Sequence, residues 1–433
     1  MEISLPRGVN DLDPADAMLM EKLVSTVSGI FRRFGFYPIS TPSIENTATL
    51  NAKAYGDEPT GEIFLLKDGD EGLRFDFTVP LARYMAMNKD LPLPFKRYQI
   101  GSIWRRDEPQ KMRHREFIQA DVDIVGSTSI ESDAEVIAAA ATALESLGLS
   151  DYQIQINSRK IMNAILEFFG LPSEKHVAAI RAIDKLQKRG ADFVSSELAS
   201  LGIAQSKAAE LLGFLGMPGS NEEKLDKIEA SIAKSKEEIA NMRRLISLLK
   251  LYNIAAEIKV EPSLARGLDY YTGSVFEFIV KRNGEQLPSI CGGGRYDNLI
   301  GIYSKRSLPA VGITVGISRI LDILGGSGGI ATYSKVFVAY IGDENADYAL
   351  GIANTLRSMN FNVDFEVMGR SISKQLEYAN ALKIRFVIIV GNIEKGSGKV
   401  KLKDMLTGKE EALTVNDAAE VIKATGEDAK ELI

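Results

Sequence analysis

The chain has 433 residues, of which 45% are hydrophobic and 25% are charged, and its net charge is −6. This balance is typical of a folded globular protein and excludes a disordered chain, while the length predicts about two or three domains. A single cysteine, Cys291, excludes an internal disulfide. No uncharged run reaches the roughly 18 apolar residues of a membrane span. The first residues lack a signal- or transit-peptide pattern, so we expect a cytoplasmic protein.

The distribution of charge is more informative than its sum, which argues mildly against a nucleic-acid partner. Residues 96–115 concentrate basic side chains, namely Lys96, Arg97, Arg105, Arg106, Lys111, Arg113 and Arg115, against Asp107 and Glu108. A local basic patch on an acidic protein is typical of a surface that binds a polyanion and then releases it. A solvated surface loop has the same composition, so both interpretations stay open.

The N-terminal region predicts one amphipathic helix. Asp13 followed by Pro14 is typical of a helix N-cap with proline at the first helical position, and Gly35 would end the helix. Between these ends one apolar face is formed by Leu19, Leu23, Val27, Ile30 and Phe34. The next segment, FYPISTPSIE, predicts an edge strand or a broken strand because it contains two prolines.

Residues 62–126 have strand-like patterns. The segments EIFLLKD and GLRFDFT predict a hairpin that turns at residues 68–71, and FKRYQIGSIWRRD and REFIQADVDIVG predict two longer strands around the connection EPQKM. In the last strand, Phe117, Gln119, Asp121 and Asp123 share one face, and the residues that alternate with them are apolar. So many polar side chains on one face predict that this face is either wet or lines a pocket.

A long helical segment follows. Residues 130–147 predict a helix, residues 152–157 a strand, and residues 161–247 are helical in pattern almost throughout. Within them, apolar residues recur every seven positions from Leu225 and again from Ile228, with one polar defect at Ser235. We favour a helix packed within an inserted helical subdomain over the alternative, a coiled coil with another chain.

Strand patterns return at residues 265–280 and continue through the glycine-rich CGGGRYDNLIG to PAVGITVGISRILDIL, before the linker signature GGSGG at 325–329. Beyond the linker, strands alternate with helices and end in a hairpin at residues 407–408, which predicts a small α/β domain. Residues 334–433 hold 13 Lys or Arg against 15 Asp or Glu, so an RNA contact there must be a local face.

Arginines dominate the side chains that could carry chemistry. The chain has two histidines and lacks a Ser/His/Asp set, a P-loop and a CxxC motif. Four arginines stand beside polar residues in strand or loop contexts: Arg105, Arg113, Arg266 and Arg319. Their planar forks suit phosphate and carboxylate, and arginines with carboxylates but no nucleophile suit phosphoanhydride chemistry. For any one of these arginines alone, a surface ion pair is the simpler interpretation.

Five segments resemble the class II aminoacyl-tRNA synthetases. FRRFGFYPISTPSIE resembles their first motif, IGSIWRRDEPQKMRHREFIQADVDIVG the second, and PAVGITVGISRI the third, which ends in an arginine. ARGLDYYTGSVFEF and CGGGRYDNLIG resemble the two segments that mark the histidine-specific family of this class. The resemblance covers essentially the whole chain, and RGLDYYTG is its most specific part.

The resemblance implies both a fold and an activity. We expect an α+β catalytic domain at residues 1–324, with an antiparallel sheet flanked by helices and a helical insertion at about 170–250. A linker at 325–333 and an α/β anticodon-binding domain at 334–433 would follow. The implied enzyme is a homodimer that activates L-histidine with ATP and transfers it to tRNA(His). Mg²⁺ would accompany ATP on its phosphate oxygens, with no permanent metal site.

The resemblance also assigns roles to the four arginines. Arg105 would bind the α-phosphate of ATP, and Arg319 would bind the γ-phosphate side. Arg113 would bind the triphosphate or steer the acceptor end of the tRNA. Arg266 would lie over the α-phosphate as a fixed cation and also contact the bound histidine. The implied catalytic residues are therefore Arg266 and Arg105.

The histidine pocket is implied in the same way. The α-amino group and the imidazole would be bound by Asp76, Gln119 and Asp123. The pocket walls would be Tyr270, Tyr271 and Tyr296, and close approach of the backbone would depend on Gly292, Gly293 and Gly294. Many bacterial members carry glutamate at the positions of Asp76, Asp123 and Ser318. The first two replacements keep the charge, whereas Ser318 loses it and is left out of the site.

Two relatives with other functions share parts of this pattern. The regulatory subunit of ATP phosphoribosyltransferase binds histidine without catalysis, typically lacks the C-terminal domain and departs from RGLDYYTG. An RNA-binding relative that has lost catalysis should lack some of Arg105, Arg266 and Arg319, which are all present here. Histidine-dependent exchange of pyrophosphate into ATP would distinguish the synthetase from both.

Overall fold

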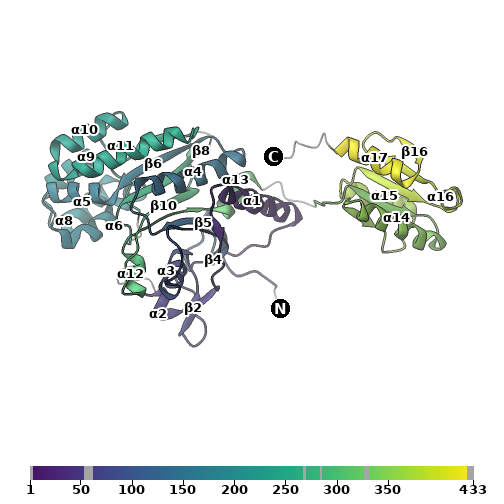
Figure 1. The fold of residues 1–433 in the computed structure, drawn as a ribbon, viewed down its shortest axis with the longest axis horizontal. Coiled ribbons are helices and arrows are strands. Elements are labelled where there is room, and N and C mark those ends of the chain that lie inside the picture. Colours follow the sequence, from purple (N-terminus) through teal and green to yellow (C-terminus); the bar gives the residue numbers. More distant parts are fainter. Residues whose placement is uncertain (1–2, 53–61, 267–269, 283–284, 326–330, 427–433) are drawn as a thin grey trace. The chain divides into compact units, whose positions relative to one another are not determined.

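A computed structural model describes residues 3–52, 62–266, 270–282, 285–325 and 331–426. The chain divides into two compact units (Figure 1). The first comprises Met1–Asn10 and Met20–Leu324, and the second comprises Gly325–Ile433 together with Asp11–Leu19. Most of the predicted linker lies outside the described residues. Within these ranges no helix is both long and apolar enough to cross a membrane.

A mostly antiparallel sheet organises the first unit, as expected for an α+β domain. In spatial order its strands are β1 (Tyr37–Pro38), β4 (Phe95–Trp104), β5 (Glu116–Val125), β11 (Ala310–Val315), β10 (Cys291–Arg295), β8 (Ser274–Arg282), β6 (Tyr152–Ser158) and β7 (Glu257–Val260), with β9 (Glu285–Gln286) paired to β8. The pairs β1–β4 and β6–β7 are parallel and the others are antiparallel. A separate ribbon pairs β2 (Ile44–Asn46) with β3 (Glu71–Leu73).

The predicted N-terminal helix is confirmed as α1 (Pro14–Arg33). Asp13 caps it by accepting a hydrogen bond from the Asp16 N–H at 3.0 Å. The buried side chains of α1 include Leu23, Val27 and Ile30. The edge strand predicted after this helix is confirmed as β1, which ends the sheet on one side.

Several helices were not predicted, and α3 (Thr78–Met87) is the one closest to the expected site. The segment TVPLARYMAM forms α3, although the surrounding residues are strand-like in pattern. The carboxylate of Asp76 accepts a hydrogen bond from the Val79 N–H at 3.1 Å and so starts the helix. Proline in the first turn does not interrupt a helix, so Pro80 is compatible with it. A short helix, α2 (Thr47–Leu50), precedes this region.

Two helices pack against β5, on which the predicted polar face lies. They are α4 (Ile130–Ser146) and α13 (Ile317–Leu324). The apolar residues Ala120, Val122 and Ile124 of β5 are buried. Ser318 of α13 accepts a hydrogen bond from the Ile118 N–H at 2.8 Å, so its hydroxyl holds the backbone of β5.

The helical insertion gathers beside β6 and β8 (Figure 1). Its helices are α5 (Arg159–Phe168), α6 (His176–Asp184), α7 (Leu186–Arg189), α8 (Ala191–Ser200), α9 (Gln205–Leu215), α10 (Asn221–Ser231) and α11 (Lys236–Leu251). The heptad pattern spans α10 and α11, which are separated at Ile232–Ser235. Its apolar residues are buried within this subdomain, so the intramolecular interpretation is confirmed.

The second unit is a small α/β fold, as predicted. Its sheet order is β13 (Val363–Phe365), β12 (Val336–Tyr340), β14 (Phe386–Val390), β15 (Val400–Asp404) and β16 (Glu410–Leu413). The first three strands are parallel and the last two form the predicted hairpin. The helices are α14 (Ala346–Ser358), α15 (Ile372–Ala381), α16 (Asn392–Ser397) and α17 (Val415–Gly426).

Candidate active site

Strand register places polar residues from four strands, together with glycines of β10 and β11, in two rows on one face of the large sheet. Directly opposed residues of an antiparallel pair point to the same face. One row contains Gln99, Asp121, Thr314, Gly292 and Glu277, and the next contains Arg97, Asp123, Gly312 and Gly294. The polar face predicted for β5 is therefore continuous across the centre of the sheet.

Asp123 is fixed at the buried end of its row. Its Oδ2 lies 2.7 Å from Nη2 of Arg97, whose side chain is 0% exposed. The hydroxyl of Tyr296 donates a hydrogen bond to the other carboxylate oxygen. A side chain at Gly312 would overlap this carboxylate, which explains a glycine opposite it. Burial raises the pKa of Asp123, and the contacts with Arg97 and Tyr296 oppose that rise.

The predicted tyrosines form a wall beside these acids. The ring centroids of Tyr270 and Tyr271 are 4.7 Å apart, and those of Tyr270 and Tyr296 are 5.8 Å apart. All three are buried in one apolar cluster. Burial raises the pKa of Tyr270, and the neighbouring Tyr271 and the carboxylate of Asp76 raise it further. Asp76 therefore faces the same wall, so the structure brings the predicted histidine-pocket residues together.

Arg266 lies over the other end of the polar row. Its Nη1 donates to the carbonyl of Phe276 at 3.2 Å, and a side chain at Gly292 would overlap its guanidinium. Gly294 is equally restricted, because an added Cβ would lie 2.8 Å from the ring of Tyr271. Gly293 faces the opposite side and packs against the backbone of β11. Gly292 and Gly294 therefore leave the space that the side chains of Arg266 and Tyr271 occupy.

The four predicted arginines converge. Burial lowers the pKa of Arg319, and the nearby charges of Arg105, Arg113 and Arg266 lower it further. Repulsion among these four guanidiniums raises the electrostatic energy of the ligand-free site, and a bound polyanion would lower that energy. This end of the pocket therefore suits a triphosphate.

Each arginine is also held in place. Arg105 donates to the carbonyl of Phe75 at 3.0 Å, which couples it to the neighbouring Asp76. Arg113 donates two hydrogen bonds to Asp107 Oδ2, at 2.9 and 2.6 Å, within the loop between β4 and β5. Arg319 donates to the carbonyl of Ser289. The forks are thus positioned before any ligand arrives, which reduces the reorganisation needed on binding.

The predicted basic patch at residues 96–115 is not one surface. Arg97 is fully buried against Asp123, and Lys96 Nζ lies 2.5 Å from an acid of α4, Glu135. In contrast, Arg106 and other residues of the loop between β4 and β5 are exposed. The interpretation as a continuous patch is therefore wrong, because strand pairing turns its first members inward.

Sequence reasoning missed several residues of this site. Asp121 lies between Gln119 and Asp123 on β5 but was given no role, although the alternation had placed it on the same face. Glu277 faces Arg266 and Arg319, whose pKa values it raises, and Arg97 pairs with Asp123. Sequence alone offers no signal for these last two, since both depend on register. If Arg266 were purely structural, the sequence would offer Asp269 as its ion-pair partner, and that residue lies outside the described residues.

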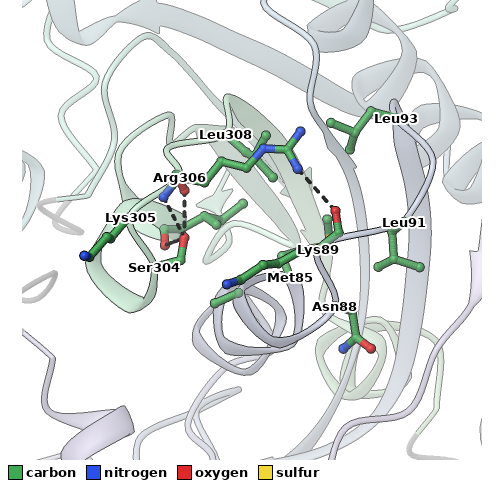
Figure 2. Close-up of a pocket in the computed structure, with 11 residues that line it drawn as sticks. Met85, Asn88, Lys89, Leu91, Leu93, Ser304, Lys305, Arg306 and Leu308 are labelled. Atoms are coloured by element: carbon green, nitrogen blue, oxygen red, sulfur yellow. Dashed lines mark hydrogen bonds between the residues drawn. The ribbon is translucent and has the colours of Figure 1, made fainter.

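A cavity of about 190 Å³ lies between α3 and α12 (Leu299–Tyr303), apart from the polar rows. Figure 2 shows Arg306 reaching across it to the carbonyl of Lys89, a hydrogen bond of 3.2 Å. Met85 and Leu308 line the cavity and also belong to the apolar cluster behind the three tyrosines. None of the predicted site residues lines it.

Comparison with known proteins identifies the family. A family model described as "Histidyl-tRNA synthetase" matches residues 8–320, and one described as "Anticodon binding domain" matches residues 335–425. The chain belongs to the histidyl-tRNA synthetase family. Family membership thus agrees with a site of carboxylates and arginines, and the fold class expected from the sequence is confirmed.

The similar proteins cover nearly the whole chain. The "Histidine--tRNA ligase" of Clostridium tetani is 37% identical over 97% of this chain and 98% of the relative, and that of Korarchaeum cryptofilum is 38% identical over 92% and 94%. The histidyl-tRNA synthetase structure from Nostoc sp. PCC 7120 matches with a TM-score of 0.84 and 30% identity, covering 98% of this chain and 100% of that one.

A structure from Bacillus halodurans, titled both as an ATP phosphoribosyltransferase regulatory subunit and as a histidyl-tRNA synthetase, shares the fold. It matches with a TM-score of 0.76 at 23% identity, covering 90% of this chain and 99% of that one. At this identity the likeness concerns the fold alone.

Proposed function

We propose a reaction course for this family member, which charges tRNA with histidine. The carboxylate of L-histidine attacks the α-phosphate of ATP, pyrophosphate leaves and histidyl-adenylate forms. A 3′-terminal ribose hydroxyl of tRNA(His) then takes the histidyl group, and AMP is released. The observation that carries this proposal is the division of one face of the large sheet into a carboxylate end and an arginine end.

The charge division orients the substrates. Tyr271 interacts electrostatically with Arg266 and also with Asp121 and Asp76, so it stands between the two ends. Histidine with its ammonium toward the acids presents its carboxylate toward the arginines. Holding the carboxylate nucleophile next to the α-phosphate makes the reaction effectively unimolecular, which lowers the entropic part of its barrier. In this arrangement Arg266 and Arg105 hold the α-phosphate, and Arg319 and Arg113 hold the leaving pyrophosphate.

Hydrogen bonds to the imidazole supply the specificity. Its two nitrogens act as one donor and one acceptor when the ring is neutral, and we assign them to the acid and tyrosine groups around Asp123. A pocket that must hydrogen-bond its ligand rejects analogues lacking those groups by up to about 10⁴–10⁵. Gln119, which is half-buried on the same strand face, would bind the α-amino group together with Asp76.

We propose that Mg²⁺ enters the site bound to the phosphates of ATP. Mg²⁺ binds a few carboxylates and phosphate oxygens in such sites and neutralises phosphate charge. Glu277 fits that role, because its half-buried carboxylate faces Arg266 and Arg319. In the described ranges no group of three or more His, Cys, Asp or Glu side chains is placed to hold a metal ion.

We propose that the second unit binds the anticodon at one edge of its sheet. Ligands of α/β sheets bind at the carboxyl ends of parallel strands. There the large apolar side chains Val367 and Ile393, which follow β13 and β14, are each 82% exposed. Arg370, three residues after Val367, is held by Glu366 at 2.7 Å. Apolar surfaces and guanidinium planes are suitable platforms for unpaired bases.

Removing residues 330–433 should separate the two activities. We expect histidine activation, measured as pyrophosphate exchange, to fall much less than transfer of histidine to tRNA(His), because the proposed activation site lies wholly in the first unit. The full chain with histidine, ATP and tRNA(His) is the reference. An equal loss of both activities in a folded truncation would contradict this division of labour.

We propose a homodimer built on the first motif. Strand β1 is a free edge of the large sheet, and edge strands need a cover. Tyr37 of this strand and Ile44 of β2, both within the first motif, are exposed large apolar side chains. Light scattering at working concentration should give twice the 47.4 kDa mass of the chain. A monomeric mass would contradict the proposal.

The cytoplasm is the compartment that we propose for this reaction. Cys291 is a buried free thiol, and burial raises its pKa. A chain with one buried thiol needs no oxidising environment to fold. Its nucleotide and tRNA substrates would be available in the same compartment.

A further inference from the structure

Asp121 is the least accessible acid of the pocket, and the reaction course above gives it no role. It is 2% exposed and lies on β5 between Gln119 and Asp123. Register places it between Gln99 of β4 and Thr314 of β11. It therefore occupies the centre of the polar row, beneath the position proposed for histidine.

Asp121 lies among groups whose charges do not balance when it is ionised, because the carboxylates of Asp76, Asp121 and Asp123 then outnumber the guanidiniums of Arg74 and Arg97 by one. Its charged or titratable neighbours are Arg74, Arg97, Asp76, Asp123, Tyr271 and Tyr296. Arg97 is already paired with Asp123 at 2.7 Å. Arg74 is held by the carbonyls of Thr41 and Ser102, and its largest attraction is to Glu45.

Asp121 is also incompletely paired. Its Oδ1 is buried and has no hydrogen-bond partner among the described residues, while the hydroxyl of Thr314 bonds to the carboxyl. Burial raises the pKa of Asp121 to about 8, with Asp123 and Asp76 adding to the rise and Arg97 and Thr314 opposing it. The acid therefore holds a proton at neutral pH when the pocket has no ligand.

We propose that Asp121 is a proton-exchanging acid of the amino-acid pocket, which gives its proton to solvent when the α-ammonium of histidine enters. The proposal rests on the reaction course above and deepens it. The charges balance: one proton leaves the carboxyl, and the ammonium supplies the positive charge in its place. Asp121 then acts as a specificity determinant, because a ligand without an ammonium cannot compensate its ionisation.

The ammonium is the favoured cation for a chemical reason. An imidazole has a pKa near about 6.5 and is mostly neutral above pH 7, whereas the ammonium is charged and offers three donors. The unpaired carboxylate oxygen of Asp121 and the carboxylates of two further acids are acceptors, and they match three donors on one positive nitrogen. A neutral ring would leave the surplus charge in place.

Calorimetry of histidine binding to the full chain at pH 7.5, in two buffers of different ionisation enthalpy, counts the protons released. We expect the wild-type protein to release a large fraction of one proton for each histidine bound, and Asp121→Asn to lose that release. Imidazolepropionate, which lacks the ammonium, should release none. Equal proton release by the wild type and Asp121→Asn would overturn the proposal.

The pH dependence of histidine use provides a second readout. We compare the KM for histidine of Asp121→Asn with that of the wild type. The ratio of the variant KM to the wild-type KM should rise by up to about tenfold per pH unit from pH 6.5 to 8, because wild-type binding requires Asp121 to lose its proton. Above about pH 8 the ratio should level off, because Asp121 is then already ionised. The KM for ATP should change little. A ratio that is constant with pH would contradict the inference.

Two further variants guard against a structural explanation. Thr314→Val removes a hydrogen bond that lowers the pKa of Asp121, so the break in the pH profile should move to higher pH. Asp133→Asn is the matched control: Asp133 is a buried acid whose pKa is raised by burial and which pairs with Arg295, outside the pocket. It should leave proton release unchanged. A Thr314→Val profile without any shift would count against the assignment.

The stability of the ligand-free protein should change in the same direction. Because burial raises the pKa of Asp121 above its ordinary value of 3.8 to about 8, the unfolded chain loses this proton first as pH rises. The contribution of this group to stability therefore decreases between about pH 4 and pH 8. In thermal unfolding experiments, the Asp121→Asn variant should lose less stability over this pH range than the wild type.

Failure of this inference is distinguishable from failure of the proposed function. A wild-type chain without histidine-dependent pyrophosphate exchange would refute the function itself. A wild-type chain that exchanges pyrophosphate, yet releases no proton through Asp121, would refute the inference alone.

Discussion

Arg266→Ala should lower the rate of histidyl-adenylate formation by at least the roughly 10²–10³-fold typical of losing one preorganised stabilising group. Negative charge on the α-phosphate grows as the carboxylate attacks, so a cation fixed there stabilises the transition state more than the ground state. Burial lowers the pKa of Arg266, but Tyr271, Glu277 and other neighbours outweigh it, so the guanidinium stays charged. Single-turnover assays with ATP and histidine measure the step.

Three variants sharpen this test. Arg266→Lys should recover only part of the rate, because a point charge does not replace a planar fork. Gly292→Ala should reproduce the loss with the arginine still present, since the added methyl group would displace its guanidinium. Arg243→Ala removes an arginine paired with surface acids of the insertion and should leave activation unchanged. Activation by Arg266→Ala within a few-fold of wild type would make Arg266 structural.

Asp123→Ala should destabilise the first unit by roughly 3–5 kcal/mol, because it strands a buried guanidinium without its partner. Arg97 is 0% exposed and keeps two further nitrogens without hydrogen-bond partners among the described residues. The free energy of unfolding in urea measures the effect. A loss below about 1 kcal/mol, the range of an exposed ion pair, would show that this pair does not hold the strands.

Gln119→Ala provides the matched comparison on the same strand face. Its side chain is half-buried and carries no charge, so stability should change little. Both Gln119→Ala and Asp123→Ala should raise the KM for histidine far more than the KM for ATP. A variant affected mainly in its ATP requirement would place this strand face at the wrong end of the pocket.

Local sequence patterns predicted much of the fold because they match local physics. The alternation of polar and apolar residues in β5 predicts a strand, and Asp13 followed by proline predicts the start of a helix. Neither prediction depends on which elements pack nearby. The helix α3 was not predicted because its first turn depends on a hydrogen bond to the carboxylate of Asp76. In the sequence, Asp76 belongs to a segment with a strand-like pattern. The heptad pattern from Leu225 continues through the interruption between α10 and α11 at Ile232–Ser235, because periodicity alone does not reveal a turn.

The site was predicted unevenly for a similar reason. The acids, tyrosines and arginines carried by the family motifs lie along one face of the large sheet, and the roles that the resemblance gives them stay predictions. Arg97 was assigned to a basic surface, because only the pairing of β4 with β5 reveals that it faces Asp123. Asp121 was visible in the alternation, but its role depends on how many charges surround it, which a single strand does not disclose.

Pyrophosphate exchange into ATP, without tRNA, tests the central claim most directly. The full chain is incubated with labelled pyrophosphate, ATP and each amino acid in turn. The proposed chemistry predicts exchange with histidine and none above background with the other amino acids. Absence of exchange with histidine, or comparable exchange with another amino acid, would contradict it and would favour a histidine-binding relative without catalysis or a different substrate.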